Sequence, residues 1–217
     1  GFMMNDGVIQ PQPPVTRALE WARQLLLAQP HLFDVKPYHP YQAKAAYERV
    51  QMCYRPDGGR KMKQILRESG EPMHPLSQWT IKDAESAVER TASEVTGYRV
   101  ARDDFRSAFA KDWNSQDVDI VIAPVFVGPA SAHDTAFYWN YTCLWNYVDY
   151  PAAIIPTPIK AEKGEQYAKD NETPLSEACQ HIRQLWNDTD FTGAPITLQV
   201  VARRYHDNEL FGSLATL

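Results

Sequence analysis

The sequence predicts an α/β fold, and three observations lead to this class. Residues 118–123 form a short β-branched apolar run, which is typical of a strand buried on both faces of a sheet. Residues 152–155 form a second such run, and the segment 135–147 between the two is long enough for a helix. Strand, helix and strand in this order make a crossover unit, whose strands we expect to be parallel and whose connection we expect to be right-handed.

Polar residues and prolines set the expected limits of this unit. Asp134 is expected to cap the helix, because its carboxylate can accept hydrogen bonds from the free N–H groups of a first turn. Pro151 excludes a longer helix, and Pro156 and Pro158 are expected to end the second strand. Ligands of such sheets bind beyond the carboxyl ends of the strands, so we expect function at the loop 124–133.

The N-terminal part of the chain predicts mainly helices. Pro13 and Pro14 stand where a helix can begin, because a proline in the first turn loses no helical hydrogen bond. Residues 32–38 are predicted to be a strand, and 41–69 two helices divided near 55–59. The first helix is expected to reach about residue 28, and its apolar stripe is Val15, Ala18, Leu19, Ala22, Leu25 and Leu26.

The middle of the chain predicts a long helical region. Thr80 and Asp83 have the spacing of a capping box, with Asp in place of the usual Glu, and predict a helix start. Gly97 is expected to mark a kink or a joint between two helices. The apolar stripe of this region is Ile81, Ala84, Val88, Val95, Tyr98, Phe105, Ala108, Phe109 and Trp113.

The last third of the chain returns to mixed structure. Residues 160–173 are polar and predict an exposed excursion, and 175–186 predict a short helix. Side chains alternate over 196–201 with the period of a strand. Asp207 is the predicted N-cap of a final helix over 209–217.

Composition and charge exclude several classes of protein. A formal net charge of -5 excludes a general nucleic-acid binder, which would need a basic surface. No apolar run has the length of a membrane span or resembles a signal peptide. Cys53, Cys143 and Cys179 lack metal-site spacing, so we expect reduced, buried thiols in a cytoplasmic protein without metal or cofactor. Because the first residue is Gly1 and not an initiator methionine, we expect a processed chain or part of a longer protein.

The residues alone predict no catalytic centre. Ser131 and His133 are the best-placed pair, but adjacency in sequence does not make a catalytic pair, and such residues more often cap helices or bond within loops. His133 and Asp134 lack a third residue spaced to complete a metal site. Cys143 lies among bulky apolar residues of the predicted helix, which favours a buried thiol.

Four segments together carry a resemblance to a known family: GFMMNDGVIQPQPPVTRAL, VDIVIAPVFVGPA, YTCLWNYVDYPAAIIP and GAPITLQVVARRYHDNEL. They resemble the C-terminal half of amidase signature enzymes, most of all the fungal acetamidase and general amidase branch, with fatty acid amide hydrolases as cousins. Many relatives have glycine before the glutamine of the last strand, where this chain has Thr197-Leu198-Gln199, and Ala202 stands where glycine is frequent. Both departures weaken a resemblance to the bacterial and Glu-tRNA amidotransferase branches more than one to the fungal branch. The resemblance implies that 1–217 is the C-terminal portion of one amidase domain, with a mixed, largely parallel sheet flanked by helices.

The family's activity is the hydrolysis of carboxamides through a serine acyl-enzyme, which a Ser–cis-Ser–Lys triad and oxyanion-binding N–H groups support. That signature belongs to the N-terminal half of the fold, so no catalytic residue is expected here, and this chain is expected to supply sheet, packing and substrate pocket. Its implied partners are a small-molecule amide and the missing N-terminal half. An incomplete fold exposes strand edges, so we expect a homodimer or poor solubility in isolation. The alternative is a catalytically inactive amidase-like fragment or partner subunit.

A substrate pocket is predicted at the helix after the 124–133 loop. Ala136, Trp139 and Cys143 have helical spacing, and the pattern alone favours packing into the core. In fatty acid amide hydrolases the matching helix lines the acyl channel, which implies that Trp139 and Cys143 face the acyl group, with Phe126 as a third wall. Trp139 would fill the space that a long chain needs, so short or compact aromatic amides are the expected substrates.

Overall fold

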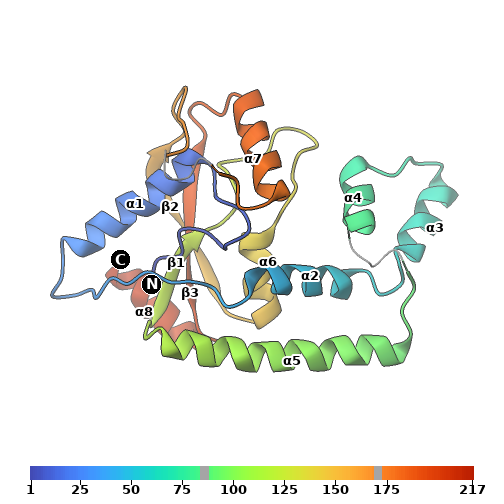
Figure 1. The fold of residues 1–217 in the computed structure, drawn as a ribbon, viewed down its shortest axis with the longest axis horizontal. Coiled ribbons are helices and arrows are strands. Elements are labelled where there is room, and N and C mark those ends of the chain that lie inside the picture. The colour runs from blue at the N-terminus through green and yellow to red at the C-terminus, as the bar shows by residue number, and fades with distance from the viewer. Residues whose placement is uncertain (84–87, 169–172) are drawn as a thin grey trace.

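The computed structural model describes residues 1–83, 88–168 and 173–217, which form helices packed on both faces of a small sheet (Figure 1). Its strands are β1 (Ile120–Pro124), β2 (Ala152–Lys160) and β3 (Pro195–Ala202), in the order β1-β3-β2. β3 is antiparallel to both neighbours, so β1 and β2 point the same way, as the crossover predicts. The two strands do not pair with each other, because the last strand of the chain lies between them.

Parallel pairing occurs at the other edge of β1. Phe2 forms parallel bridges with both Ile122 and Pro37, and the Met3 N–H donates to the Ile122 carbonyl at 2.9 Å. The sheet is therefore mixed, as predicted, but it is not largely parallel: both described strand pairs are antiparallel, and the parallel contacts are isolated bridges. The predicted strand 32–38 contributes only the bridge at Pro37.

β2 differs most from its predicted form. It runs through Pro156 and Pro158 to Lys160, with an irregular register after Pro156. Its residues alternate between half-buried and exposed, and Ile154 is 55% exposed, so the strand is not buried on both faces. Within the described part of the sheet β2 pairs only with β3, and an edge strand tolerates prolines because its free side needs no N–H donors.

The N-terminal helices begin and end close to the predicted residues. α1 (Pro13–Leu27) starts at the first of the paired prolines, as expected. It buries the expected stripe from Val15 to Ala22, but Leu25 at its end is exposed. α2 (Ala43–Tyr54) and α3 (Arg60–Ser69) are divided at 55–59, as predicted. Gly59 has φ 74°, and an added Cβ there would lie 2.9 Å from Ile81 Cδ1, so the turn requires glycine.

The next two helices correct the predicted capping box. α4 (Pro75–Asp83) already includes Thr80, whose hydroxyl donates to the Leu76 carbonyl at 2.8 Å. The capping box instead joins Thr91 and Glu94 at the start of α5 (Ala92–Ser115). α5 continues through Gly97 without the predicted break. Of the predicted stripe, Phe105, Phe109 and Trp113 are buried, Val88 is exposed, and Ala84 lies outside the described residues.

The remaining helices are α6 (Asn140–Val148), α7 (Glu177–Asp188) and α8 (Asp207–Thr216). His206, and not Asp207, is the N-cap of α8. The excursion 160–173 is largely exposed where it is described, and 169–172 lie outside the described residues. Glu165 is its anchor, because its carboxylate pairs with Arg17 at 2.7 Å.

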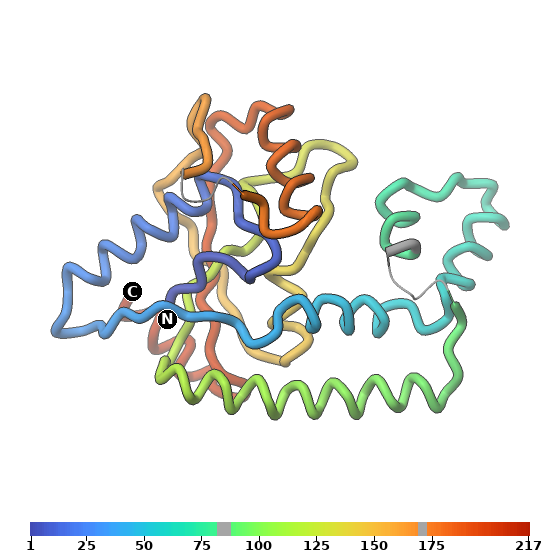
Figure 2. Tube along the Cα trace, viewed as in Figure 1, coloured from blue at the N-terminus to red at the C-terminus, as the bar shows by residue number. Residues whose placement is uncertain are grey.

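Two apolar clusters occupy opposite faces of the sheet. α1 and α8 contact β3 on one face, and α2, α5 and α6 pack together on the other (Figure 1). The α3–α4 hairpin, defined here as residues 60–83, projects beyond the far ends of α2 and α5, away from the sheet (Figure 2). Among the described residues no helix is both long and apolar enough to cross a membrane. None of the cysteines is paired; Cys143 and Cys179 are buried as expected, but Cys53 is exposed.

Candidate functional site

The loop that follows β1 is longer than predicted, because α6 begins only at Asn140. Asp134 and Tyr138 have φ values of 63° and 62°, in the left-handed region that an α-helix cannot include. Asp134 is therefore not a helix cap, and Ala136 lies outside the helix, so the predicted stripe of 136, 139 and 143 does not form. Trp139 is the N-cap residue of α6.

The two ends of this loop are tied together by the buried side chain of Gln199 on β3. Its Nε2 donates to the Pro124 carbonyl at 2.6 Å, where β1 ends, and to the Tyr141 carbonyl at 2.8 Å, where α6 begins. The Tyr141 hydroxyl donates in turn to the Ile9 carbonyl. Sequence reasoning treated Gln199 only as part of a strand, although a polar residue among buried apolar neighbours was a usable signal.

The first part of the loop packs against the N-terminal segment. The Gln12 N–H donates to the Val127 carbonyl at 2.7 Å. A Cβ added at Gly128 would collide with the end of the Gln12 side chain, so any other residue here would displace that side chain.

The three predicted pocket residues pack against one apolar cluster, but their exposure differs. Cys143 is 1% exposed inside α6, and burial raises the pKa of its thiol to about 12. Phe126 is half-buried against the same cluster. Trp139 is also half-buried, and its neighbours Tyr138 and Asn140 line a cavity.

This cavity, called the α2–α7 cavity below, has a volume of about 650 Å³. α2 forms one wall, Tyr138 and Asn140 a second and residues 176–178 a third. Its lining residues are Val8, Lys44, Tyr47, Glu48, Gln51, Met52, Tyr138, Asn140, Ser176, Glu177 and Ala178. The volume is that of a small-molecule site.

Two buried carboxamide side chains in the cavity wall have unused hydrogen-bonding capacity. Gln51 and Asn140 are each 4% exposed. Neither polar atom of Gln51, nor Oδ1 of Asn140, has a hydrogen-bond partner among the described residues. The other end of the Asn140 amide bonds to Asp6, which also accepts the Val8 and Ile9 N–H groups at 2.8 Å. Burial raises the pKa of the Asp6 carboxyl.

An aromatic group connects the α3–α4 hairpin to the cavity edge. The Trp79 ring meets the rings of Phe137, Tyr138 and Trp139 edge-on, with centroids 5.2, 5.5 and 5.4 Å away. The hairpin makes a second contact through His74 Nε2, which lies 2.9 Å from Asp134 Oδ1. Sequence reasoning missed both contacts, because nothing local links residues so far apart in the chain.

The described residues contain no hydrogen bond between a serine or cysteine and a histidine side chain. Ser131 and His133 are both exposed and unconnected. Ser176 lines the cavity, but its hydroxyl donates to the Val8 carbonyl and accepts the Cys179 N–H. No group of three metal-ligating side chains occurs in the part of the chain that the structure describes. These residues can bind and orient a ligand, but they do not provide a nucleophile with a base.

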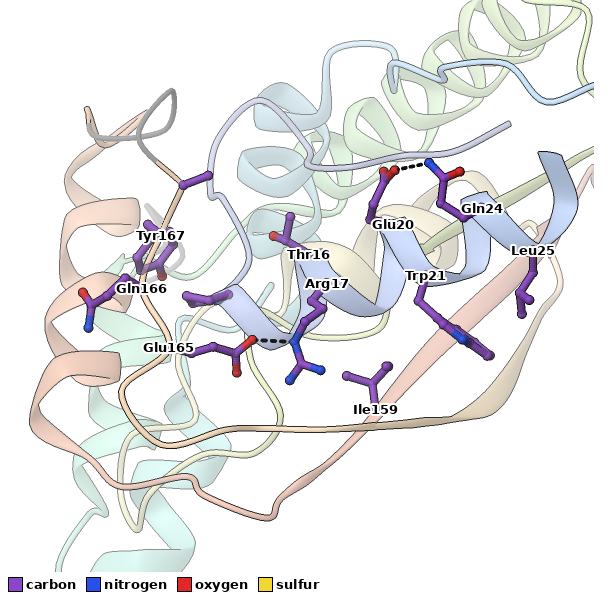
Figure 3. Close-up of a pocket in the computed structure, with 12 residues that line it drawn as sticks. Thr16, Arg17, Glu20, Trp21, Gln24, Leu25, Ile159, Glu165, Gln166 and Tyr167 are labelled. Carbon is purple, nitrogen blue, oxygen red and sulfur yellow. Dashed lines mark hydrogen bonds and ion pairs between the residues drawn. The ribbon is translucent and has the colours of Figure 1, made fainter. Parts of the chain in front are cut away.

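A second groove of about 730 Å³ lies on the other face of the sheet, between α1, the end of β2 and residues 165–168 (Figure 3). Its charged side chains are paired within the chain. Arg17 contacts Glu165 at 2.7 Å and Glu162 at 3.1 Å, and it also donates to the Lys160 carbonyl. Glu20 accepts from Gln24 at the groove's upper wall (Figure 3). We therefore place the candidate site at the α2–α7 cavity, where polar atoms lack partners.

Comparison with known proteins identifies the family. The family model described as Amidase matches residues 1–211. The chain belongs to the amidase family. A Schizosaccharomyces pombe protein that carries the name of an amidase is 32% identical over 218 residues, covering 99% of this amidase-family chain. The acetamidase of Aspergillus oryzae is 26% identical, and 94% of the chain is covered. The predicted resemblance to the fungal acetamidase branch is confirmed.

Structure comparison agrees with this family. A solved structure of fatty acid amide hydrolase superposes with a TM-score of 0.84 and 26% identity over 96% of the chain. The predicted amidase-type fold is confirmed. The amidase-family chain spans 40% of the Schizosaccharomyces pombe protein and 37% of both the acetamidase and the fatty acid amide hydrolase chain.

Proposed function

We propose that the full-length protein hydrolyses carboxamides through a serine acyl-enzyme and that this chain forms one side of its substrate pocket. The observation that carries the proposal is the family match over 1–211, together with the α2–α7 cavity. The names of the acetamidase and of the fatty acid amide hydrolase support amides as the substrate class.

The chemical step is assigned to the part of the protein beyond this chain. A Ser–cis-Ser–Lys triad there would activate the serine, whose Oγ attacks the amide carbonyl. Ammonia or an amine leaves, and water then releases the carboxylic acid from the acyl-enzyme. Backbone N–H groups would stabilise the oxyanion. The division agrees with the described residues, which place no nucleophile beside a base.

Trp139 remains a proposed pocket residue: it does not line the cavity itself, but its chain neighbours Tyr138 and Asn140 do. Phe126 and Cys143 remain proposed pocket residues, and Cys143 would support the wall from the core side, since it is buried in α6. The bulk of Trp139 and Trp79 at the cavity edge favours short or compact aromatic amides over long-chain ones.

The alternative is an amidase-like protein without activity. It is favoured by one observation, the absence of a nucleophile–base pair in the described ranges 1–83, 88–168 and 173–217. For the active protein we propose a cytoplasmic location, on the basis of three unpaired thiols. The exposed edge strand β2 supports self-association of residues 1–217 when they are separated from the rest.

Ammonia release from acetamide, benzamide and fatty acid amides by the purified full-length protein tests the proposal. We expect turnover and labelling by a serine-directed probe, and no turnover by residues 1–217 alone. A full-length protein that neither hydrolyses amides nor reacts with the probe would support the inactive alternative. Turnover by residues 1–217 that is lost in Ser131→Ala would show that the chemistry lies in this chain.

A further inference from the structure

We infer that the α2–α7 cavity binds a second polar group of the substrate, a carboxamide remote from the one that is cleaved, through Gln51 and Asn140. This inference rests on the proposed function and names a substrate class for it: small dicarboxamides. It assigns specificity to two residues that neither the family match nor the relatives' names indicate.

Three polar atoms of Gln51 and Asn140 lack hydrogen-bond partners among the described residues. Gln51 provides an acceptor, Oε1, and a donor, Nε2, and Asn140 provides a further acceptor, Oδ1. All three atoms are buried and lack partners in the described ranges. Buried polar groups in folded proteins are nearly always hydrogen-bonded, and one that is not calls for an explanation, such as a missing ligand.

The contacts of Asn140 and Gln51 within the chain explain why these atoms lack partners. The Asn140 amide is oriented by its bond to Asp6, which leaves Oδ1 unused. Asp6 accepts in turn from the Val8 and Ile9 N–H groups. Gln51 has no such anchor, and its carboxamide can therefore turn about its side-chain bonds toward a ligand in the cavity.

The charged side chains that line the cavity are all exposed: Lys44, Glu48 and Glu177. Lys44 and Glu48 lie one helical turn apart on α2 and offset each other, whereas Glu177 adds a negative charge at the solvent-facing rim. The buried part of the wall is contributed by neutral polar and apolar groups, including Gln51, Asn140 and Val8. A neutral ligand group that both donates and accepts hydrogen bonds suits this buried wall better than an ion does, because a buried ion would need an opposite charge beside it.

A primary carboxamide complements the polar atoms of Gln51 and Asn140. A primary carboxamide has one carbonyl acceptor and two N–H donors. Once the two side chains turn toward the cavity, the carbonyl can accept from Gln51 Nε2, and the two N–H groups can donate to Gln51 Oε1 and Asn140 Oδ1. A substrate that ends in an alkyl group would leave all three protein atoms without partners, and sites built to hydrogen-bond a substrate discriminate strongly against such analogues.

The bound carboxamide is the remote one, because the cleaved carbonyl must meet a nucleophile and oxyanion donors. The Ser176 hydroxyl, which lines the cavity, already has two bonds within the chain. The cavity therefore holds the end of the substrate that does not react.

The experiment compares kcat/KM of the full-length protein for succinamide and adipamide with kcat/KM for butyramide and hexanamide, in which an alkyl end replaces the remote carboxamide. We expect the better diamide to be favoured on the order of tenfold. Gln51→Leu should bring the diamide-to-monoamide ratio close to one without lowering the melting temperature, because it removes unpartnered polar atoms. Gln180→Leu, on the exposed side of α7, is the matched control and should keep the wild-type ratio.

The outcomes separate the inference from the proposed function. Hydrolysis of all four amides without a diamide preference would overturn the inference and leave the function intact. A Gln51→Leu protein that loses stability while keeping the ratio would overturn it too, because Gln51 would then be a structural residue. If no amide is hydrolysed, the proposed function fails, and equilibrium binding of succinamide against butyramide decides the inference.

Discussion

Replacing Gln199 by methionine is the sharpest test of how the site is held in place. Gln199 is 2% exposed, and its Nε2 donates to the Pro124 and Tyr141 carbonyls. Methionine has a similar length and no polar hydrogen, so the substitution removes both hydrogen bonds with little change in packing. The two carbonyls belong to regular elements and keep a second lone pair for the bonds of the strand and the helix.

The expected loss therefore follows from two hydrogen bonds and not from two orphaned carbonyls. A buried neutral hydrogen bond contributes about 0.5–1.5 kcal/mol net, so the free energy of unfolding should fall by about 1–3 kcal/mol. Because these bonds fix both ends of the loop that carries Trp139, activity should fall as well. Denaturant unfolding of the full-length protein measures the first quantity, and kcat/KM for its preferred amide measures the second.

Two further variants make this test specific. Thr197→Val changes an exposed residue of the same strand and should stay within about 0.5 kcal/mol of wild type. Gln199→Glu should be less stable than Gln199→Met at neutral pH, because a carboxylate beside two carbonyl oxygens cannot donate. As the pH falls and this carboxyl binds a proton, it regains one donor and part of the stability should return. A Gln199→Met protein within about 0.5 kcal/mol of wild type would refute the role given to Gln199.

Three other predictions address the residues around the cavity. Trp139→Ala in the full-length protein should raise the ratio of long-chain to short-chain amide hydrolysis; a lower melting temperature with an unchanged ratio would make Trp139 a core residue. Burial raises the Asp6 pKa above 3.8, so the folded state holds its proton more tightly and the free energy of unfolding should fall as pH rises from that value through the folded pKa. Asp6→Asn should remove this slope, and an identical pH profile would contradict the desolvation. Iodoacetamide should modify exposed Cys53 well before Cys143, which is buried and has a thiol pKa of about 12. Equal labelling rates by mass spectrometry would show that Cys143 is accessible to the reagent and not buried.

The sequence alone determined the features that depend on neighbouring residues. The start of α1 at Pro13, the division between α2 and α3 at 55–59, and the strand over 195–202 follow from proline geometry, glycine turns and side-chain alternation. The same local reasoning named the 124–133 loop and Trp139. The resemblance carried by four segments pointed to the family, although no residue of the chain showed its chemistry.

The tertiary structure decided the features that depend on residues far apart in the chain. The sequence could not show that β1 and β2 flank β3, because β3 lies far from both along the chain and pairs with both. The start of α6 depends on the contacts of Asp134 with His74 and of Tyr138 with Trp79, which hold left-handed conformations that 134–138 would not prefer alone. Gln51 and Asn140 became candidate binding residues only when folding brought α2 beside α6 and left their amides unpartnered. Local patterns show the periodicity of a segment and where it begins and ends. Whether a buried polar group finds a hydrogen-bond partner depends on residues that only the fold brings together.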